Sequence, residues 1–283
     1  MKSLTIFSPA KVNLFLKVLG KRKDGYHELL TLFHRISLGD KITIKKIDSG
    51  FQFKSNHPKL KNAKENLIYK TYLALKKETK WDGGVDVFLD KKIPVAAGLG
   101  GGSSNAAHFM MGMNQLFKLG LSRAKMVNIG SKLGADVPFF LYEARQAFGF
   151  GKGERIRVWP GRQKYWLVLV ISPYEIATRD VFNRLGAPEL TRISRDATIT
   201  SEFLRQAFNH FFLSNDLFLT SCRLRPKLKQ IDALFDRLGV TQRLMSGSGP
   251  TFFSFHKPKN EAERIAKKLK HRLSAAVLIC RTY

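Results

Sequence analysis

The segment PVAAGLGGGSSNAAHFM, from Pro94 to Met110, sets a glycine-rich run and two serines directly before an Ala- and Met-containing run that favours a helix. Before it, GVDVFLDKKIP alternates Val85, Val87 and Leu89, which is the spacing of a strand. Backbone N–H groups in a glycine loop can bind an anion, and a helix that follows adds the positive end of its dipole. The order strand, glycine loop, helix therefore predicts a phosphate site, with a tight packing turn as the alternative.

Three common phosphate loops do not fit this segment. A Walker A loop requires a lysine directly after its last glycine, and no lysine follows Gly102. A dinucleotide fold places its glycines in the first strand-to-helix turn, with an acidic residue about 20 positions later. Lys118 to Leu121 contains no carboxylate. The H-R-D and D-F-G signatures of protein kinases are also absent from the chain.

Composition predicts a soluble, cytoplasmic protein without a membrane partner. The chain has 283 residues, 44% of them hydrophobic, which suffices for one large core or two smaller ones. Cys222 and Cys280 lie far apart without a CxxC spacing, so neither a disulfide framework nor a zinc site is indicated. The N-terminus lacks the pattern of a signal peptide. The longest apolar run, Trp166 to Ile171, is far shorter than the roughly 20 residues of a membrane span.

The formal net charge of +27 attracts polyanions of any kind. The basic residues are spread along the chain rather than gathered in one tail, and no nucleic-acid recognition motif accompanies them. We therefore expect no nucleic-acid partner.

The pattern of expected elements indicates an α+β protein with two domains, at residues 1–157 and 158–283. SPAKVNLFLKVLG alternates with period two, so Lys11 and Asn13 share one strand face, and Lys17 on that face is read as a solvated lysine. A helix is expected from Ser122 to Leu133 with Ser122 as its N-cap. AFGFGKGERIRVW reads as a hairpin, and from Trp166 onward strands alternate with helical segments, including helical patches between Thr178 and Phe218.

Three segments in order, SPAKVNLFL, PVAAGLGGGSSNAA and MSGSGPTFF, resemble the motifs of the GHMP kinases. The second segment departs from the family pattern P-x-x-x-G-L-G-S-S-A by the insertion Gly-Gly-Gly-Ser-Ser-Asn. With DGYHE, ENLIYK and LGADVPFF, it is similar to the member of the family that acts on a cytidine-diphosphate-linked methylerythritol. The resemblance implies an N-terminal domain of ribosomal-protein type and a ferredoxin-like C-terminal domain. It also implies ATP-dependent phosphorylation of the tertiary 2-hydroxyl of that sugar alcohol, in the non-mevalonate isoprenoid pathway.

The resemblance assigns the catalytic roles to Asp136 and Lys11. Asp136, in GADVP, matches the family's catalytic aspartate, which accepts the proton of the attacking hydroxyl. Phosphoryl transfer asks mainly for positioning and for charge stabilisation, so this carboxylate orients the nucleophile. Lys11 is implied to lie beside it and to keep it ionised. The alternatives are an N-cap for Asp136 and a solvated strand lysine for Lys11.

The resemblance places the cytidine on another set of side chains. Tyr26 offers an aromatic plane, and His27 can donate or accept a hydrogen bond at the edge of cytosine. Phe182 matches by position an aromatic residue that stacks on the other face of the base, with a core phenylalanine as the alternative. Asn13 is implied to hydrogen-bond the substrate.

The remaining expectations concern ATP. Asn66 is implied to lie near the adenine. The SGSGP motif at Ser246 to Pro250 is implied to close the floor of the site, with a hairpin turn between two strands as an alternative that is compatible with this role. Mg²⁺ is expected with ATP, held largely by phosphate oxygens and water, and no protein ligand is named for it. The residues expected to bind ATP in the loop are Pro94, Val95, Ala96, Ala97, Gly98, Leu99, Gly100, Gly101, Gly102, Ser103 and Ser104.

Two alternative functions stay open. The first is another GHMP kinase that acts on homoserine or a mevalonate derivative, against which the GYHE segment argues. The second, from a different class, is a nucleic-acid-binding protein, motivated by the net charge and by the ribosomal type of fold that the resemblance implies for the first domain.

Overall fold

The computed structural model describes residues 2–60, 65–161, 164–186 and 200–283. It contains two sheets and helices, which confirms the predicted α+β class. Contacts within the chain divide it into two compact units, each made of several segments. The first unit contains Met1–Ala10, Leu38–Val95 and Gly100–Ala144; the second contains Lys11–Ser37, Ala96–Leu99 and Arg145–Tyr283. This grouping is not a single cut in the chain, so the domain bounds 1–157 and 158–283 stay a prediction.

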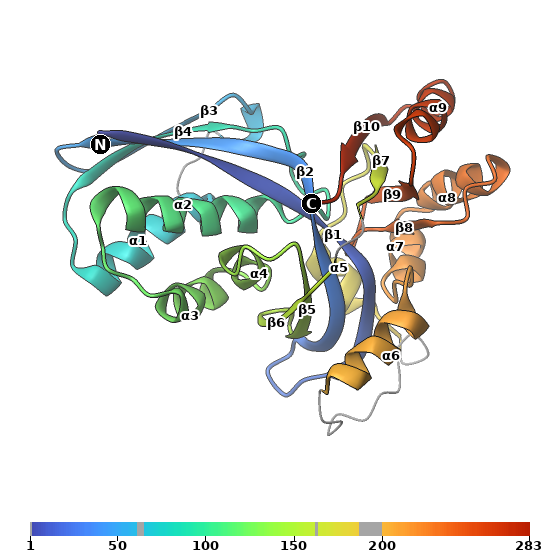
Figure 1. The fold of residues 1–283 in the computed structure, drawn as a ribbon, viewed down its shortest axis with the longest axis horizontal. Coiled ribbons are helices and arrows are strands. Elements are labelled where there is room, and N and C mark those ends of the chain that lie inside the picture. The colour runs from blue at the N-terminus through green and yellow to red at the C-terminus, as the bar shows by residue number, and fades with distance from the viewer. Residues whose placement is uncertain (1, 61–64, 162–163, 187–199) are drawn as a thin grey trace. The chain divides into compact units, whose positions relative to one another are not determined.

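The first unit sets helices on one side of strands, as Figure 1 shows for α1 to α4. The strands β1 (Ser3–Lys21) and β2 (His27–Ile47) each run through both units. Here β2 pairs antiparallel with β4, with Lys41 opposite Asp90, and β3 runs parallel to β4. The other elements of the unit are β3 (Phe51–Ser55), a 3-10 helix (Pro58–Leu60), α1 (Leu67–Thr79), β4 (Gly84–Asp90), α2 (Gly101–Phe117), α3 (Arg123–Leu133) and α4 (Val137–Leu141).

Helix α3 follows the sequence prediction closely. The Ser122 hydroxyl accepts a hydrogen bond from the backbone N–H of Lys125, which satisfies one of the donors that a helix start leaves unpaired. The helix ends at Leu133, with Gly134 as its C-cap. The expected helix and its N-cap are thus confirmed.

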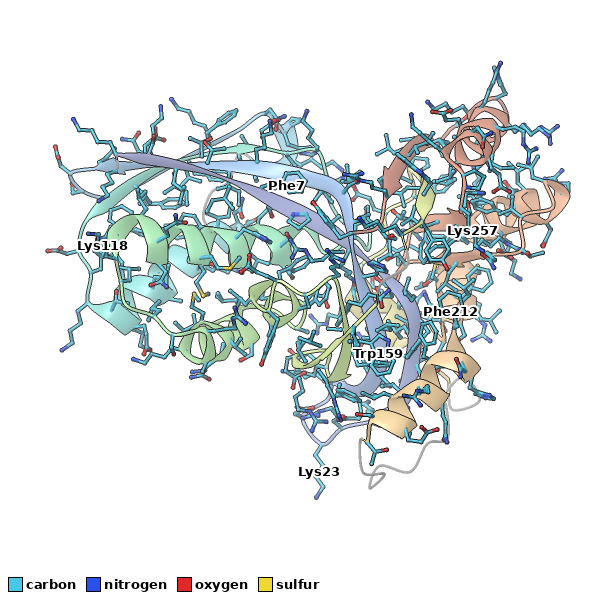
Figure 2. The ribbon with its side chains drawn as sticks, viewed as in Figure 1. Phe7, Lys23, Lys118, Trp159, Phe212 and Lys257 are labelled. Carbon is cyan, nitrogen blue, oxygen red and sulfur yellow. The ribbon has the colours of Figure 1, made fainter. Side chains whose placement is uncertain are left out.

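The second unit contains a hairpin and a separate four-stranded sheet. β5 (Gln146–Gly151) and β6 (Arg155–Trp159) form the predicted antiparallel hairpin, which continues onto β2. Trp159, labelled in Figure 2, packs edge-on against Phe148 with ring centroids 5.1 Å apart. The second sheet has the order β10-β7-β9-β8, with β7 (Trp166–Ile171), β8 (Arg243–Met245), β9 (Thr251–His256) and β10 (Ala276–Arg281).

Helices complete the second unit around the apolar face of this sheet. Ile231, Leu234 and Phe235 of α8 share one buried core with Ile265 and Leu269 of α9, at the helical spacing that the sequence shows. Residues 187–199 of the predicted helical region lie outside the described residues. The helices are α5 (Thr178–Asn183), α6 (Ser201–Phe211), α7 (Phe218–Leu224), α8 (Leu228–Arg237) and α9 (Lys259–Lys270).

One local expectation is corrected. The prediction that Lys17 is solvated is wrong. Its Nζ lies 2.7 Å from Asp216 Oδ1, and its side chain is only 14% exposed. Asp216 also accepts the backbone N–H of Val18, so the carboxylate fastens the segment before α7 to β1. Period two could not reveal this partner, which is distant in the sequence.

Among the helices of the described residues, none is both long and apolar enough to cross a bilayer.

His34 on β2 gives the second unit a dependence on pH. Its ring is 2% exposed, and burial lowers its pKa from 6.5 to about 4. The unfolded chain therefore binds a proton in a range where the folded chain does not, so acid lowers the free energy of unfolding. As the pH falls from 6.5 to 4, protonation of this histidine in the unfolded chain should lower the free energy of unfolding by about 3 kcal/mol, at about 1.4 kcal/mol per pH unit.

Urea titrations at several pH values measure this loss. The His34→Gln variant should lose about 3 kcal/mol less stability than the parent over that range. Equal losses in the two proteins would show that another group carries the acid sensitivity.

Candidate active site

The glycine loop before α2 uses left-handed backbone at alternate residues, with φ values of 56° at Ala96, 75° at Gly98 and 67° at Gly100. Gly98 has a second reason to lack a side chain. A Cβ there would lie 2.5 Å from the carbonyl oxygen of Ser246 and 2.8 Å from that of Gly249. The Ser246 hydroxyl donates to the Gly98 carbonyl across 3.0 Å. The tight packing turn considered as an alternative is thus present, and it joins the loop to the SGSGP motif.

Helix α2 begins inside the glycine run, at Gly101. Its first intrahelical bond runs from the N–H of Ser104 to the carbonyl of Gly100. The N–H groups of Gly101, Gly102 and Ser103 therefore precede the helical ladder, and Gly102 is exposed. Unpaired N–H groups at the N-terminal, positive end of a 17-residue helix can donate hydrogen bonds to phosphate oxygens. The residues thus fit the phosphates of ATP.

Ser104 makes contacts with β1 that its position in the sequence does not reveal. The side chain is fully buried, and its hydroxyl lies 2.6 Å from the carbonyl oxygen of Pro9, to which it donates, and 2.8 Å from Ser8 Oγ. These bonds tie the start of α2 to β1. A contact from Ser104 to ATP stays a prediction, whereas Ser103 is only half-buried.

Lys11 and Asn13 share one face of β1, as the alternation predicts. Lys11 Nζ donates to Asn13 Oδ1 across 2.7 Å, and Asn13 Nδ2 donates to Thr31 Oγ1 across 2.8 Å. Lys11 is 4% exposed and Asn13 is 2% exposed, so the solvated-lysine alternative does not hold for Lys11. A Cβ on Gly247 would lie 3.4 Å from Asn13 Oδ1 and 3.8 Å from Lys11 Nζ. The SGSGP motif therefore lies against both predicted residues.

Asn215 holds this motif in place and was missed in the sequence. Its Nδ2 donates to the carbonyl oxygens of Met245 at 2.8 Å and Gly247 at 2.7 Å. Its segment runs beside β1, where Asn215 bridges Leu16. No local signal distinguishes an asparagine that bonds to carbonyls 30 residues later, so sequence reasoning had no means of finding it.

Asp136 occupies the N-cap position of α4 in the first unit. Its side chain makes no hydrogen bond that caps the helix, so capping does not explain the carboxylate. The side chain is half-buried. The base role of Asp136 and its closeness to Lys11 stay predictions.

Of the residues expected to bind cytosine, His27 and Phe182 contact each other, whereas Tyr26 is exposed. His27 and Phe182 come from distant parts of the chain, and their rings stack with centroids 5.3 Å apart and an interplanar angle of 29°. Burial, with a smaller effect of Lys21, lowers the pKa of His27, so a neutral ring can both donate and accept at neutral pH. Tyr26 is 59% exposed, and Lys152 Nζ lies 4.5 Å from the centroid of its ring.

Glu28 fixes the turn that carries these rings. Its carboxylate accepts from Arg22 Nη1 at 2.6 Å, Arg155 Nη2 at 2.8 Å and the backbone N–H of Gly151 at 3.0 Å. The turn between β1 and β2 is thereby joined to the β5–β6 hairpin, and Figure 2 shows Lys23 at its tip pointing away from the ribbon. The sequence indicates no role for Glu28 beyond its place as the last residue of the GYHE segment.

Asn66 is the N-cap of α1, and its Oδ1 accepts the N–H of Ile68 at 3.0 Å. One end of its amide is thus used by the helix, and the adenine role stays a prediction. Across the described residues, no group of three or more His, Cys, Asp or Glu side chains could hold a metal ion. That phosphate oxygens and water hold most of the coordination of Mg²⁺ stays a prediction.

Comparisons with known proteins agree with this geometry. Residues 66–144 match the family model of the GHMP kinases N terminal domain, and residues 202–275 match that of the GHMP kinases C terminal domain. The chain is 38% identical to the 4-diphosphocytidyl-2-C-methyl-D-erythritol kinase of Syntrophus aciditrophicus (strain SB), covering 92% of each chain. It is 37% identical to the enzyme of the same name from Citrifermentans bemidjiense, covering 95% of each.

Solved structures give the same result. A crystal structure of 4-(cytidine 5'-diphospho)-2C-methyl-D-erythritol kinase matches with a TM-score of 0.81 and 31% identity, covering 98% of this chain and 99% of the other. A homoserine kinase from Cytophaga hutchinsonii matches with a TM-score of 0.69 at 17% identity, covering 100% of this chain and 95% of the other, which shows a shared fold. The chain therefore belongs to the GHMP kinase family of ATP-dependent small-molecule kinases.

Proposed function

We propose that the protein phosphorylates the 2-hydroxyl of 4-diphosphocytidyl-2-C-methyl-D-erythritol with ATP, as a cytoplasmic enzyme of the non-mevalonate isoprenoid pathway. The observation that carries this choice is the stack of His27 on Phe182 beside the GYHE turn. The face of the Phe182 ring and the neutral imidazole of His27 suit a nucleobase, which stacks on aromatic faces and offers hydrogen-bonding edges. Neither mevalonate nor homoserine carries such a base. The similarity to kinases named for the cytidylated substrate supports the same choice.

The reaction assigns one task to each group. The Asp136 carboxylate accepts the proton of the 2-hydroxyl as its oxygen bonds to the γ-phosphorus, the bond to the bridging oxygen breaks, and ADP leaves. Lys11 supplies positive charge beside the reacting oxygens, and Asn13, which accepts from Lys11 Nζ, orients it. The N–H groups of Gly101, Gly102 and Ser103 receive the phosphate charge at the start of α2. Mg²⁺ bound with ATP would supply further charge neutralisation, and phosphate oxygens and water would be most of its ligands.

A substrate panel tests the proposal. The purified protein is assayed for ADP release with the cytidylated methylerythritol, mevalonate and homoserine at equal concentrations. We expect kcat/KM for the cytidylated substrate to exceed the other two by at least about 100-fold, the discrimination that one lost stacked base allows. Absence of turnover with the cytidylated substrate would refute the choice, and turnover of homoserine or mevalonate alone would favour the related kinases.

The nucleic-acid alternative is tested with the same preparation. Tight, salt-sensitive RNA binding in a protein without ATP turnover would support that class. We expect ATP turnover that is insensitive to added RNA, because the net charge of +27 is spread along the chain.

A further inference from the structure

A buried carboxylate in the first unit, Asp40 of β2, is bonded to both sides of the glycine loop. Asp40 is 0% exposed. Its Oδ1 accepts the backbone N–H groups of Lys92 at 2.7 Å and Ile93 at 2.8 Å. Its Oδ2 accepts Lys91 Nζ at 2.6 Å and Asn105 Nδ2 at 2.8 Å. Four donors thus converge on one carboxylate, and each is within strong hydrogen-bond distance.

The donors to Asp40 lie on the two sides of the glycine loop in the sequence. Lys91 to Ile93 form the segment directly before Pro94, where the loop begins, whereas Asn105 lies in the early part of α2, after the loop. A single side chain therefore fixes the entry of the loop and the helix that leaves it. Since the ends of a short loop limit its conformations, holding both ends holds the N–H groups between them.

A second set of bonds continues this arrangement to β1. Asn105 Nδ2 also lies 3.0 Å from Ser8 Oγ, and Ser8 Oγ lies 2.8 Å from Ser104 Oγ. The residue before Asp40 is Gly39, where a Cβ would overlap the ring of Phe7, labelled in Figure 2, and come within 2.8 Å of the Ser8 carbonyl oxygen. The absence of a side chain at Gly39 thus lets β1 lie close to the carboxylate.

The charge of Asp40 matters as well as its bonds. The Lys91 side chain is 5% exposed, and burial lowers the pKa of its ammonium although Asp40 raises it. A Cβ on Gly101 would lie 3.0 Å from Lys91 Nζ, so this ammonium lies beside the first residue of α2. A buried cation at the positive end of a helix dipole is unfavourable unless an anion compensates it. Asp40 supplies that anion.

We propose that Asp40 is a positioning residue for ATP: through Lys91–Ile93 and Asn105 it holds the glycine loop and the start of α2 in the conformation that receives the phosphates. The inference rests on the proposed role of this loop in binding ATP. According to this proposal, a residue of β2 that is far from the glycine motif in the sequence controls the affinity for the nucleotide.

The test measures nucleotide binding apart from catalysis. The Asp40→Asn variant keeps the shape of the side chain, but its Nδ2 brings an amide donor into a site that already holds donors from Lys91 and Asn105. Titration calorimetry with a non-hydrolysable ATP analogue should show a dissociation constant raised about tenfold, with KM for ATP raised equally. The KM of the acceptor substrate should change less than about twofold.

A second variant and a control complete the experiment. Asn105→Ala removes one donor from Asp40 and leaves the Lys91 ion pair intact, so it should disturb folding less than Asp40→Asn does. It should still raise the dissociation constant of the ATP analogue about threefold. Asp232→Asn removes a carboxylate that Arg243 Nε approaches at 2.8 Å, an ion pair with no bond to the loop, and should leave the analogue's affinity unchanged. Wild-type affinity in folded Asn105→Ala would overturn the proposal, as would an equal loss in the control.

Failure of the proposed substrate is distinguishable from failure of this inference. The analogue reports on the loop whichever acceptor the enzyme uses. Weaker binding in Asp40→Asn together with no turnover of the cytidylated acceptor would uphold the positioning role and reject only the acceptor.

Discussion

Replacement of Asp136 by Asn is expected to lower kcat by about 10³-fold, within the range that a positioned general base contributes. The amide keeps the shape of the carboxylate but cannot accept the hydroxyl proton. The loop that receives the phosphates is unchanged, so KM for ATP should stay within about twofold. Steady-state assays of ADP release with the cytidylated acceptor measure both constants. Turnover close to that of the parent would remove Asp136 from the role of base.

The control for this variant comes from its place at α4. A urea titration of the Asn variant is the control: if Asp136 acts only as the base, the variant unfolds at the same urea concentration as the parent, and no capping bond of α4 is lost. By comparison, Ser122→Ala removes a capping bond that the structure does contain and should cost about 1 kcal/mol without changing kcat. Loss of both stability and turnover in Asp136→Asn would indicate a structural role.

Replacement of His27 by Ala is expected to raise KM for the cytidylated acceptor about 10-fold to 100-fold, because the hydrogen bond to the edge of the base and the support for the stacking ring of Phe182 are both lost. The variant removes a ring that stacks on Phe182 and a neutral group able to bond the edge of a base. The KM for ATP should not follow, because the glycine loop does not depend on this ring. Equal increases in the two KM values would contradict the cytosine assignment.

Two further variants sharpen this result. Phe182→Leu keeps an apolar side chain in the core but removes the aromatic face, so it should raise the acceptor KM with little effect on stability. His271→Ala changes an exposed histidine after α9 and should leave both KM values unchanged.

Sequence patterns predicted well those features that depend on neighbouring residues. The N-cap at Ser122, the hairpin of β5 and β6 and the shared face of Lys11 and Asn13 follow from local chemistry and period. The strand, loop and helix around Gly98 were predicted for the same reason. Their three-dimensional consequence, the approach of Gly98 to Ser246, was not visible.

Features that depend on distant partners could not be predicted. The sequence indicates a solvated strand lysine at Lys17, because its partner, Asp216, lies on a separate segment. The bond from the Ser104 hydroxyl to the Pro9 carbonyl of β1 has no local signal either, and the contact of Ser104 with ATP stays a prediction. No residue near Asp40 in the sequence indicates its role, because only the fold brings its four donors together.

The bridge between Leu16 and Asn215 has a consequence for the order in which the enzyme acquires its site. During synthesis, Lys11 and Asn13 leave the ribosome long before Gly247, which lies against them in the folded chain. Closing so long a loop is slow, because its entropy is lost before the contacts form. A chain stopped after its N-terminal motifs would carry the phosphate loop and the predicted base, yet it would lack the wall against which Lys11 and Asn13 are held. The surroundings of Lys11 and Asn13 can therefore fold only after the segment that contains Gly247 has been synthesised.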